Sequence, residues 1–253
     1  MSLSAMEEQL MQLLSADDAT PIGRIAEQLY VSESTARRYV AALAKKGWVI
    51  RTHGGCLLCH GAADRNTPMY IRFSSEQDCK RKMAELAATL IPPAATVFLD
   101  SSSTAFHLAP YLGKERGTVA ITSGLKTAIS LIEHNVRTIC LGGEIRADNL
   151  SASSTAAVQS VADFNADVFF FSCDALSDEG RMTDDSYEEC LLRRAFMKHA
   201  EKKVLMVDPS KRGKRCPYTL GDLRDVDYCI TVVDGEAVFL DRATFFDRMK
   251  EEA

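Results

Sequence analysis

Residues 31–55 read VSESTARRYVAALAKKGWVIRTHGG, and this stretch concentrates positive charge in a chain that is acidic overall. Between Ser32 and His53 it holds five Lys or Arg residues against a single Glu, a local charge of +4. The 253 residues together carry −5, so the rest of the chain carries −9. Because salt screens charges more than about 10 Å apart, a polyanion would be attracted to this segment even though the whole protein is acidic.

The same stretch has the pattern of a helix followed by a β-hairpin. Ser32 can cap a helix that places Ala36, Val40 and Leu43 on one apolar face, and Gly47 is expected to end it. The next residues, WVIRTHGGCLL, alternate β-forming side chains around a His-Gly-Gly turn, which is typical of a two-stranded hairpin.

Two further helices are expected before this one. Apolar residues recur at helical spacing between Ser4, an available N-cap, and Leu14. Thr20 and Pro21 are expected to form the cap and first turn of the next helix, which ends near Tyr30, because proline is tolerated in a first helical turn. Three short helices and a hairpin within about 58 residues describe a winged helix-turn-helix, a fold that presents a helix to duplex DNA.

This composite pattern resembles the helix-turn-helix of the DeoR family of bacterial transcriptional regulators. The matching positions are Val31, Ser32, Thr35, Arg37, Arg38, Gly47, Arg51, His53, Gly54 and Gly55, whereas Tyr39 stands where the family commonly has Asp. A helix N-terminus bearing Ser and Thr can contact phosphate, and arginine can contact phosphate or guanine edges. The residues expected to contact operator DNA are Ser32, Ser34, Thr35, Arg37, Arg38, Lys45, Arg51, His53 and Gly54. From charge alone, the alternative is a solvated helix face in a small domain that binds another protein.

The residues after the hairpin lack sustained periodicity, and we predict a linker at residues 59–75. Cys56, Cys59 and His60 have the Cys-x-x-Cys-His spacing of c-type haem attachment. Haem is disfavoured because covalent attachment normally occurs outside the cytoplasm and no export signal is present. A metal site using these residues and His53 lacks a second paired motif that would complete four ligands. We therefore expect neither a metal nor a cofactor.

The sequence also indicates a compartment. No window of 18 consecutive apolar residues occurs, and the N-terminus lacks the basic, apolar and small-residue order of a secretory signal. The eight cysteines form no compact framework, and several lie in apolar runs where a thiol behaves as a small hydrophobe. These features favour a cytoplasmic protein with reduced thiols and no membrane segment.

Beyond Glu76 the pattern changes to alternating helices and strands. A helix is expected from Glu76 to Leu90, and six apolar or β-branched runs follow at helix-length separations, namely ATVFLD, TVAIT, VRTICLGG, ADVFFFS, KKVLMVD and VDYCITV. This rhythm predicts an α/β domain with an open, mostly parallel sheet. The expected organisation is a winged helix-turn-helix at residues 1–58, the linker, and the α/β domain at residues 76–253.

Ligands of such sheets bind at the carboxyl ends of the strands. The loops expected there are DSSST at 100–104, TSGLK at 122–126, GGEIR at 142–146, residues 172–185 and residues 208–215. Their hydroxyls, glycines and backbone N–H groups, with Arg146 or Lys211 adding charge, favour a phosphate-bearing ligand. The candidate ligand-binding residues are Asp100, Ser102, Ser103, Thr104, Thr122, Ser123, Gly124, Gly142, Gly143, Glu144, Arg146, Asp174 and Lys211.

The order of these loops is similar to that of the C-terminal effector domain of the DeoR family. That domain is similar in fold to ribose-5-phosphate isomerase and commonly senses phosphorylated sugars. Glu189 matches a family acid and Arg193 stands where Lys is common, while Ser102, Ser172 and Ala175 replace family glycines. The resemblance implies a transcriptional repressor that binds double-stranded operator DNA and responds to a small phosphorylated metabolite. Self-association is expected, because paired reading heads on repeated half-sites multiply the affinity.

The alternative from another class is a sugar-phosphate isomerase-like enzyme with an accessory DNA-binding head, in which a carboxylate acts as a base. We expect no catalysis. The acidic residues ahead of the helix CLLRRAFMKHA are more simply interpreted as charges that favour a helix N-terminus; they are Asp184, Asp185, Glu188 and Glu189. No Walker, dinucleotide-binding or nucleophile-elbow motif is present.

Overall fold

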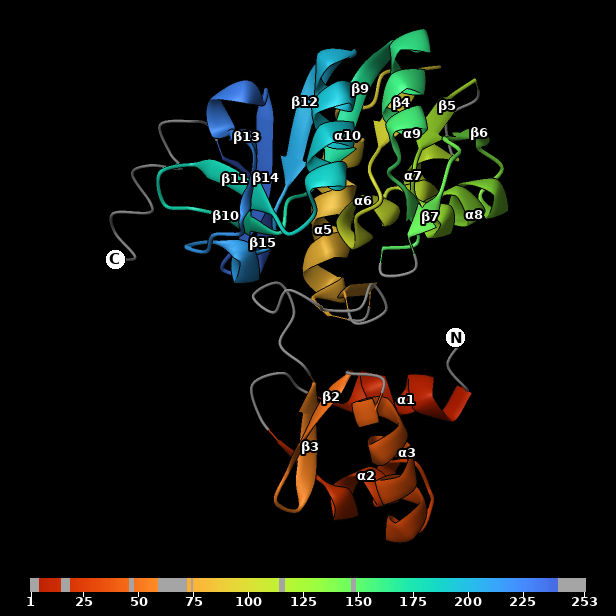
Figure 1. Ribbon diagram of the computed structural model, residues 1–253, viewed down its shortest axis with the longest axis vertical. Helices are drawn as coiled ribbons and strands as arrows, with labels where there is room; N and C mark the ends of the chain where they lie inside the picture. The colour runs from red at the N-terminus through yellow and green to blue at the C-terminus, as the bar shows by residue number, and fades with distance from the viewer. Residues whose placement is uncertain are drawn as a thin grey trace. The chain divides into compact units, whose positions relative to one another are not determined.

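The computed structural model describes residues 5–14, 19–45, 48–58, 72–73, 75–113, 117–146 and 149–240. The chain divides into two compact units, Met1–Ser75 and Glu76–Ala253 (Figure 1). Ser4, Gly47 and most of the predicted linker lie outside the described residues. None of the helices in the described ranges is long and apolar enough to cross a membrane.

In the first unit, residues 5–58, apart from the gaps given above, form three helices and a small antiparallel sheet (Figure 1). Its elements are α1 (Ala5–Leu13), β1 (Thr20–Pro21), α2 (Ile22–Gln28), α3 (Glu33–Lys45), β2 (Val49–Thr52) and β3 (Gly55–Leu58), and the sheet order is β1-β3-β2. Each helix turns apolar residues inward, so that Leu10, Ile25 and Leu43 are fully buried in one core with Trp48. The predicted winged helix-turn-helix is confirmed.

The helix predicted to start at Thr20 and Pro21 begins one residue later, at Ile22, and Pro21 is its N-cap. Thr20 and Pro21 also pair with Cys56 and Gly55 of β3, and Pro21 has extended backbone dihedrals with φ −62° and ψ 144°. The fixed φ of proline is compatible with this conformation as well as with a helical turn, so the sequence does not distinguish the two. The strands can approach because Gly55 lacks a side chain: a Cβ there would collide with the carbonyl oxygen of Thr20.

The hairpin between β2 and β3 is closed by His53 and Gly54, as the pairing of Thr52 with Gly55 shows. Gly54 has φ 98°, a conformation that side chains disfavour and that tight two-residue turns use. The amide N–H of Ile22 donates to the carbonyl oxygen of Gly54 at 2.9 Å. This bond ties the wing to the start of α2.

Ser32 caps α3, as predicted, because its Oγ accepts a hydrogen bond from the amide N–H of Thr35 at 3.2 Å. We expect Ser32→Ala to lower the free energy of unfolding of the first unit by about 1 kcal/mol, since that amide loses its partner. Trp48, the only tryptophan of the chain, lies in the core of this unit, so its fluorescence during urea unfolding reports on this unit within the full-length protein. Ser34→Ala is the control: it removes a hydroxyl that lies 2.9 Å from Oγ of Ser32 but leaves that oxygen to accept from the amide of Thr35. An equal loss in both variants would contradict the capping role.

The second unit is built around a seven-stranded sheet in the order β15-β14-β12-β9-β4-β5-β6. Its strands are β4 (Thr96–Leu99), β5 (Val119–Thr122), β6 (Arg137–Cys140), β9 (Ala166–Phe171), β12 (Ala200–Met206), β14 (Tyr228–Val233) and β15 (Glu236–Leu240). Neighbouring strands are parallel except β14 and β15, which are antiparallel. The predicted open, mostly parallel sheet is confirmed, and β15 is an edge strand that was not predicted from the sequence.

Two smaller sheets stand beside the main one. They are the hairpin of β7 (Ile145–Arg146) with β8 (Ser151–Ala152), and a three-stranded sheet of β10 (Ala175–Leu176), β11 (Arg181–Asp184) and β13 (Tyr218–Asp222). Short 3-10 helices cover Val161–Asp163, Pro209–Lys211 and Leu223–Asp225. Residues 172–185 were expected to form a loop, so β10 and β11 correct that expectation.

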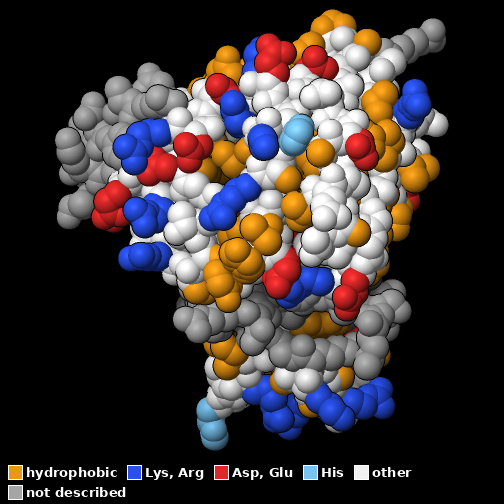
Figure 2. All heavy atoms as spheres, turned by 45° about the horizontal axis from the view of Figure 1, so that its top comes forward, with side chains coloured by type: hydrophobic (Ala, Val, Ile, Leu, Met, Phe, Trp, Pro, Cys, Tyr) orange, Lys and Arg blue, Asp and Glu red, His pale blue; other side chains and the backbone are white. Residues whose placement is uncertain are grey.

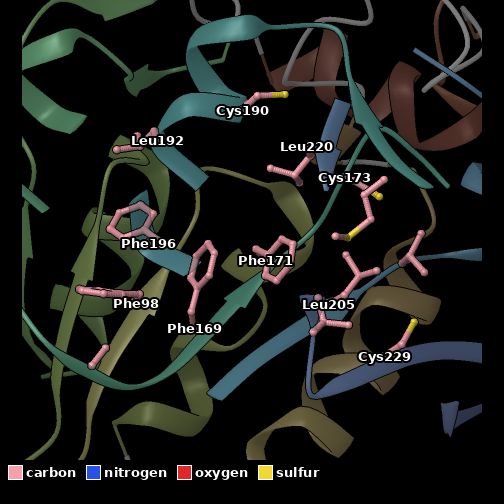
Figure 3. Packing of buried hydrophobic residues seen from close by; sticks show 14 of the residues in the cluster. Phe98, Phe169, Phe171, Cys173, Cys190, Leu192, Phe196, Leu205, Leu220 and Cys229 are labelled. Atoms are coloured by element: carbon pink, nitrogen blue, oxygen red, sulfur yellow. The ribbon is translucent and has the colours of Figure 1, made fainter. Parts of the chain in front are cut away.

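Helices cover both faces of the main sheet (Figure 1). They are α5 (Gln77–Ala88), α6 (Ser103–Phe106), α7 (Ala109–Leu112) and α8 (Leu125–Glu133) on one face, and α9 (Thr155–Ser160) and α10 (Tyr187–Lys198) on the other. Strand side chains alternate between the faces: Val97 and Leu99 pack with α5–α8, whereas Phe98 packs with α10. Figure 3 shows the rings of Phe98 and Phe169 beside Phe196 of α10, with centroids 4.8 and 5.1 Å from that of Phe196.

The strand order reverses between β4 and β9. From β4 the chain proceeds outward through β5 and β6, and it then returns to the other side of β4 to build β9, β12 and β14. Open α/β sheets bind ligands outside the carboxyl ends of their strands at such a reversal. Asp100 directly follows β4 and Ser172 directly follows β9, so both stand at this point.

Candidate DNA-binding surface and sensor site

The candidate DNA-contacting residues lie on the outer surface of the first unit. Ser32, Ser34, Arg37, Arg38 and Lys45 are exposed on α3 and its cap, Thr35 is partly exposed, and Arg51, His53 and Gly54 are exposed on the wing. Lys and Arg side chains gather on this unit in the lower part of Figure 2. Every one of the nine residues is therefore accessible from solvent.

The two adjacent arginines of α3 are held differently. The guanidinium of Arg37 donates to Glu33 at 2.8 Å, and both side chains are more than half exposed. Arg38 has no ion-pair partner among the described residues, and its guanidinium carbon lies 5.8 Å from the ring centroid of Tyr39. Tyr39 in turn packs against the core. Arg38 is therefore the more available cation of the pair.

The Cys-x-x-Cys-His segment begins inside the core. Cys56 is fully buried on β3, and burial raises the pKa of its thiol to about 11. Cys59 and His60 lie outside the described residues. No group of three or more His, Cys, Asp or Glu side chains suited to a metal ion occurs in the described ranges.

Asp100 links several loops at the point where the strand order reverses. Its Oδ1 accepts hydrogen bonds from the amide and the hydroxyl of Ser102, at 3.0 and 2.5 Å. Its Oδ2 accepts from the amide of Ser172 at 3.2 Å and from Nε of Arg193 at 2.8 Å. One buried carboxylate thus joins the ends of β4 and β9 to α10.

Arg193 of α10 is enclosed by carboxylates. Its guanidinium lies 2.8 Å from Asp100, 2.9 Å from Asp184 and 3.8 Å from Glu189, and no side chain of the four is more than 5% exposed. Burial opposes the charge of Arg193, but Asp184, Asp100 and Glu189 raise its pKa well above the usual value. Burial raises the pKa of Asp184 well above its usual range. Arg193 is thus committed to partners inside the protein.

Glu189 connects the β7–β8 hairpin to the loop after β4. Its two carboxylate oxygens accept hydrogen bonds from the hydroxyls of Ser151 at 2.5 Å and Ser101 at 3.0 Å. Ser151, Ser101 and Glu189 are all buried. Neither serine was among the candidate ligand-binding residues.

The interpretation of Asp184 as a charge at a helix N-terminus is wrong. Asp184 ends β11, is 1% exposed and faces Arg193, while Glu188 and Glu189 are in the first turn of α10. Glu188 is exposed and pairs with Arg146 at 3.1 Å. The four-residue spacing of Glu189 and Arg193 was a usable signal for an ion pair on one helix face. No local pattern in the sequence indicates that Asp184 joins them.

Ser172 contacts Lys211 as well as Asp100. Lys211 is 8% exposed, and its ammonium donates to the hydroxyl of Ser172 at 3.0 Å and to the carbonyl oxygen of Cys173 at 2.8 Å. Asp208 is 4.0 Å away. An ammonium has three N–H donors, so these two bonds leave capacity for a third.

The remaining candidate residues divide into buried and exposed sets. Ser102, Ser103, Thr104, Thr122, Ser123 and Gly124 are buried, Asp174 and Arg146 are partly buried, and Gly142, Gly143 and Glu144 are exposed. Gly124 approaches the loop after β4 so closely that a Cβ would lie 2.9 Å from Cα of Ser101. The structure therefore joins the loops after β4, β5 and β9, whereas the Gly-Gly-Glu loop after β6 is solvent-facing.

Several buried hydroxyls near these loops have no hydrogen-bond partner among the described residues. They belong to Thr104, Ser123, Thr127 and Ser153, none of which is more than 3% exposed. Most buried polar groups in proteins are paired, so such a set indicates sites that water or a ligand satisfies. Thr127 and Ser153 were not predicted from the sequence.

The positions that differ from the family glycines do not require glycine. Ser102 has φ −66°, and neither Ser172 nor Ala175 is among the residues with positive φ. The hydroxyl of Ser102 also accepts a hydrogen bond from the amide of Ala105 at 3.1 Å and so caps α6. The side chains at these positions are accommodated without backbone strain.

His107, which follows α6, makes the stability of the second unit depend on pH. Burial, together with the charges of Lys80 and Arg81, lowers its pKa from 6.5 to about 4. As pH falls from about 6.5 to about 4, the unfolded chain gains a proton that the folded chain does not bind, so stability is lost across this window. We expect His107→Gln to remove about 2 kcal/mol of that loss. Urea unfolding followed by circular dichroism at pH 7 and pH 4.5 tests this, and equal losses in both proteins would contradict it.

Both units match domains of one family. Residues 7–62 match the DeoR-like helix-turn-helix domain, and residues 75–233 match the DeoR C terminal sensor domain. Over 227 residues the chain is 30% identical to the HTH-type transcriptional regulator GolR of Listeria innocua, covering 89% of each chain. It is 26% identical over 223 residues to the glycerol-3-phosphate regulon repressor of Escherichia coli K12, covering 88% of each. The HTH-type transcriptional repressor CsqR of the same strain is 28% identical over 226 residues, covering 88% of this chain and 85% of that protein.

Solved structures show a similar fold at low sequence identity. The tetrameric eIF2B-beta2-delta2 complex from C. thermophilum has a chain with a TM-score of 0.52 and 14% identity, covering 100% of this chain and 96% of that one. Ribose 5-phosphate isomerase A from Methanocaldococcus jannaschii has a TM-score of 0.48 and 13% identity, covering 66% of this chain and 100% of that one. Together, the two matched domains and the relatives aligned along most of their length show that the chain belongs to the DeoR family of transcriptional regulators.

Proposed function

We propose that this chain is a transcriptional repressor that binds double-stranded operator DNA through α3 and the wing. The observation that carries the proposal is the exposed row of Ser34, Arg37 and Arg38 on α3, in a unit where Lys and Arg gather although the chain is acidic. The helix can enter the major groove while Arg51 and His53 of the wing contact phosphates. A duplex selected from a random library by the full-length protein provides the operator for binding measurements by fluorescence anisotropy. Failure to enrich any sequence, with no binding to duplex DNA, would refute the proposal.

We propose further that a small phosphorylated sugar or a related metabolite binds at the carboxyl ends of β4, β5 and β9 and changes the affinity for DNA. One relative is named a glycerol-3-phosphate regulon repressor, which supports a phosphorylated effector. The buried hydroxyls of Thr104 and Ser123 are available to accept and donate hydrogen bonds. Arg193 is enclosed by carboxylates, so Lys211 and Arg146 are the better candidates to face a phosphate.

A thermal-shift screen tests the effector proposal. Sugar phosphates that bind the folded protein raise its melting temperature, whereas the same sugars without phosphate do not. Ser123→Ala should reduce that shift because it removes one of the buried hydroxyls at this edge of the sheet. Thr231→Val is the matched control, since Thr231 also has a buried hydroxyl without a partner but lies within β14. Equal shifts with phosphorylated and unphosphorylated sugars would contradict a phosphate site.

We propose that the chain acts in the cytoplasm and does not catalyse a reaction. The buried carboxylates at this edge of the sheet are engaged. Asp100 and Asp184 bind Arg193, Glu189 accepts from two serines, and Asp208 accepts from the amide of Ser210. The relatives named above are transcriptional regulators, which supports the same conclusion. Turnover of a sugar phosphate by the purified protein, abolished in Asp100→Asn, would overturn it.

We propose that the working form is a homo-oligomer. One helix in one major groove buries little surface, and two reading heads on repeated half-sites multiply affinity through effective concentration. Sedimentation of the full-length protein with operator should give an even number of chains per duplex. A single chain per duplex would contradict this proposal.

A further inference from the structure

The turn between α2 and α3 contains a tyrosine where the backbone favours glycine. The amide N–H of Tyr30 donates to the carbonyl oxygen of Glu27 at 3.2 Å, and that of Val31 donates to Ala26 at 3.0 Å. These two bonds form the motif that commonly ends a helix, in which the residue after the C-cap is left-handed and is usually Gly or Asn. Tyr30 occupies that position with φ 53°. The fold therefore imposes an unfavourable backbone conformation on this residue.

Burial of the Tyr30 ring does not offset this backbone strain. The residue is 95% exposed, the highest value among the large hydrophobic residues described. It is absent from the core of the first unit, although its neighbour Val31 packs against that core. A residue that is both strained and unburied lowers stability, and such outliers cluster where function requires the side chain.

The position of Tyr30 indicates which function this is. It stands two residues before Ser32, whose hydroxyl caps α3, and so borders the end of α3 that carries Ser34 and Arg37. Tyrosine hydroxyls donate hydrogen bonds to DNA phosphates. A tyrosine also loses little conformational entropy on binding, because only two side-chain torsions must be fixed. A residue next to the N-terminus of α3 can contact the sugar-phosphate backbone beside the groove that α3 enters.

We propose that Tyr30 is a DNA-contacting residue whose hydroxyl donates a hydrogen bond to a backbone phosphate and positions α3 in the groove. The inference rests on the proposed operator binding. Since the interaction is with the backbone, it strengthens binding to all sequences by a similar factor. Since the donor is uncharged, it leaves the salt dependence of binding unchanged, unlike an arginine bound to phosphate.

Two variants test the proposal in the full-length protein by operator anisotropy and by urea unfolding followed through Trp48 fluorescence. Tyr30→Phe keeps the ring and removes the donor, and should weaken binding to operator and to unrelated duplex about fivefold, with an unchanged salt slope. Tyr30→Gly should weaken binding at least as much while raising the urea midpoint of the first unit by about 0.5 M, because the backbone strain is relieved. This opposite movement of stability and affinity separates a role in DNA binding from a structural role.

Gln28→Ala, at an exposed position near the end of the same helix, is the control and should change neither quantity. Wild-type affinity in Tyr30→Gly would overturn the proposal and leave operator binding itself standing. Wild-type affinity in Tyr30→Phe with weakened binding in Tyr30→Gly would overturn the hydrogen bond from the hydroxyl. Absence of DNA binding by the wild-type protein would instead refute the proposed function.

Discussion

Replacing Arg193 by methionine should lower the free energy of unfolding of the second unit by about 3–5 kcal/mol, because it leaves buried carboxylates without their cation. Asp100, Asp184 and Glu189 all lie within 4 Å of this guanidinium and are almost fully buried. Since whole domains are stable by only about 5–15 kcal/mol, this loss is at least about a fifth of the stability expected for the second unit. Urea unfolding followed by far-ultraviolet circular dichroism measures the change in the second unit, and Trp48 fluorescence reports the first unit separately.

The neighbouring residue supplies the control for this prediction. Arg194 is exposed and donates to the carbonyl oxygens of Thr219 and Leu220, so Arg194→Ala should cost about 1 kcal/mol. Arg193→Lys keeps the charge but lacks the planar guanidinium that reaches Asp100 and Asp184 together. Its loss in free energy of unfolding should therefore lie between those of Arg193→Met and Arg194→Ala. A wild-type urea midpoint in Arg193→Met would show that this buried cluster does not hold the loops together.

Replacing Arg38 by alanine should weaken operator binding by about 1–3 kcal/mol if the guanidinium reads a base edge. Arg38 is exposed on α3, has no ion-pair partner among the described residues and lies over the ring of Tyr39. Arg37→Ala should have the smaller effect, because Glu33 at 2.8 Å competes with DNA for that guanidinium. Fluorescence anisotropy titrations against operator and a scrambled duplex measure the affinities of both variants, Arg38→Ala and Arg37→Ala.

The salt dependence shows which part of the DNA Arg38 binds. If Arg38 reads a base, Arg38→Ala relaxes specificity at one position of the operator. If it binds a phosphate, the same variant weakens binding to all sequences and flattens the salt slope by about one unit. Glu33→Gln is the complementary variant and should bind operator more tightly than wild type, since it frees Arg37 and removes a negative charge that DNA repels. Unchanged affinity in Arg38→Ala and in Arg37→Ala would remove α3 from the DNA interface.

The first unit could be predicted because its signals are local. The hydroxyl of Ser32, the helical spacing of Ala36, Val40 and Leu43, and the turn at Gly54 each act within a few residues. The strand pairing of Thr20 and Pro21, next to the start of α2, was not predicted because it depends on β3, which lies far along the sequence. Local propensity carries no information on such a partner.

In the second unit, too, local sequence patterns predicted only part of the candidate sensor site. Alternating buried strands indicated the parallel sheet and hence the edge at which Asp100 and Ser172 meet. The small sheet of β10, β11 and β13 was missed because β10 has only two residues, and β11 and β13 contain charged residues and Gly221 in place of a continuous apolar run. Asp184 is neutralised by a residue on another element, so its burial could not be read from the residues around it.

We propose that a metabolite bound by the second unit changes the affinity of the first unit for DNA. One measurement tests this proposal most directly. Operator affinity of the full-length protein is measured with and without each sugar phosphate that raises its melting temperature. We predict that at least one of them changes the dissociation constant about tenfold or more, and that Ser123→Ala keeps the basal affinity while losing much of this response. Identical affinity with and without every stabilising sugar phosphate would contradict the account.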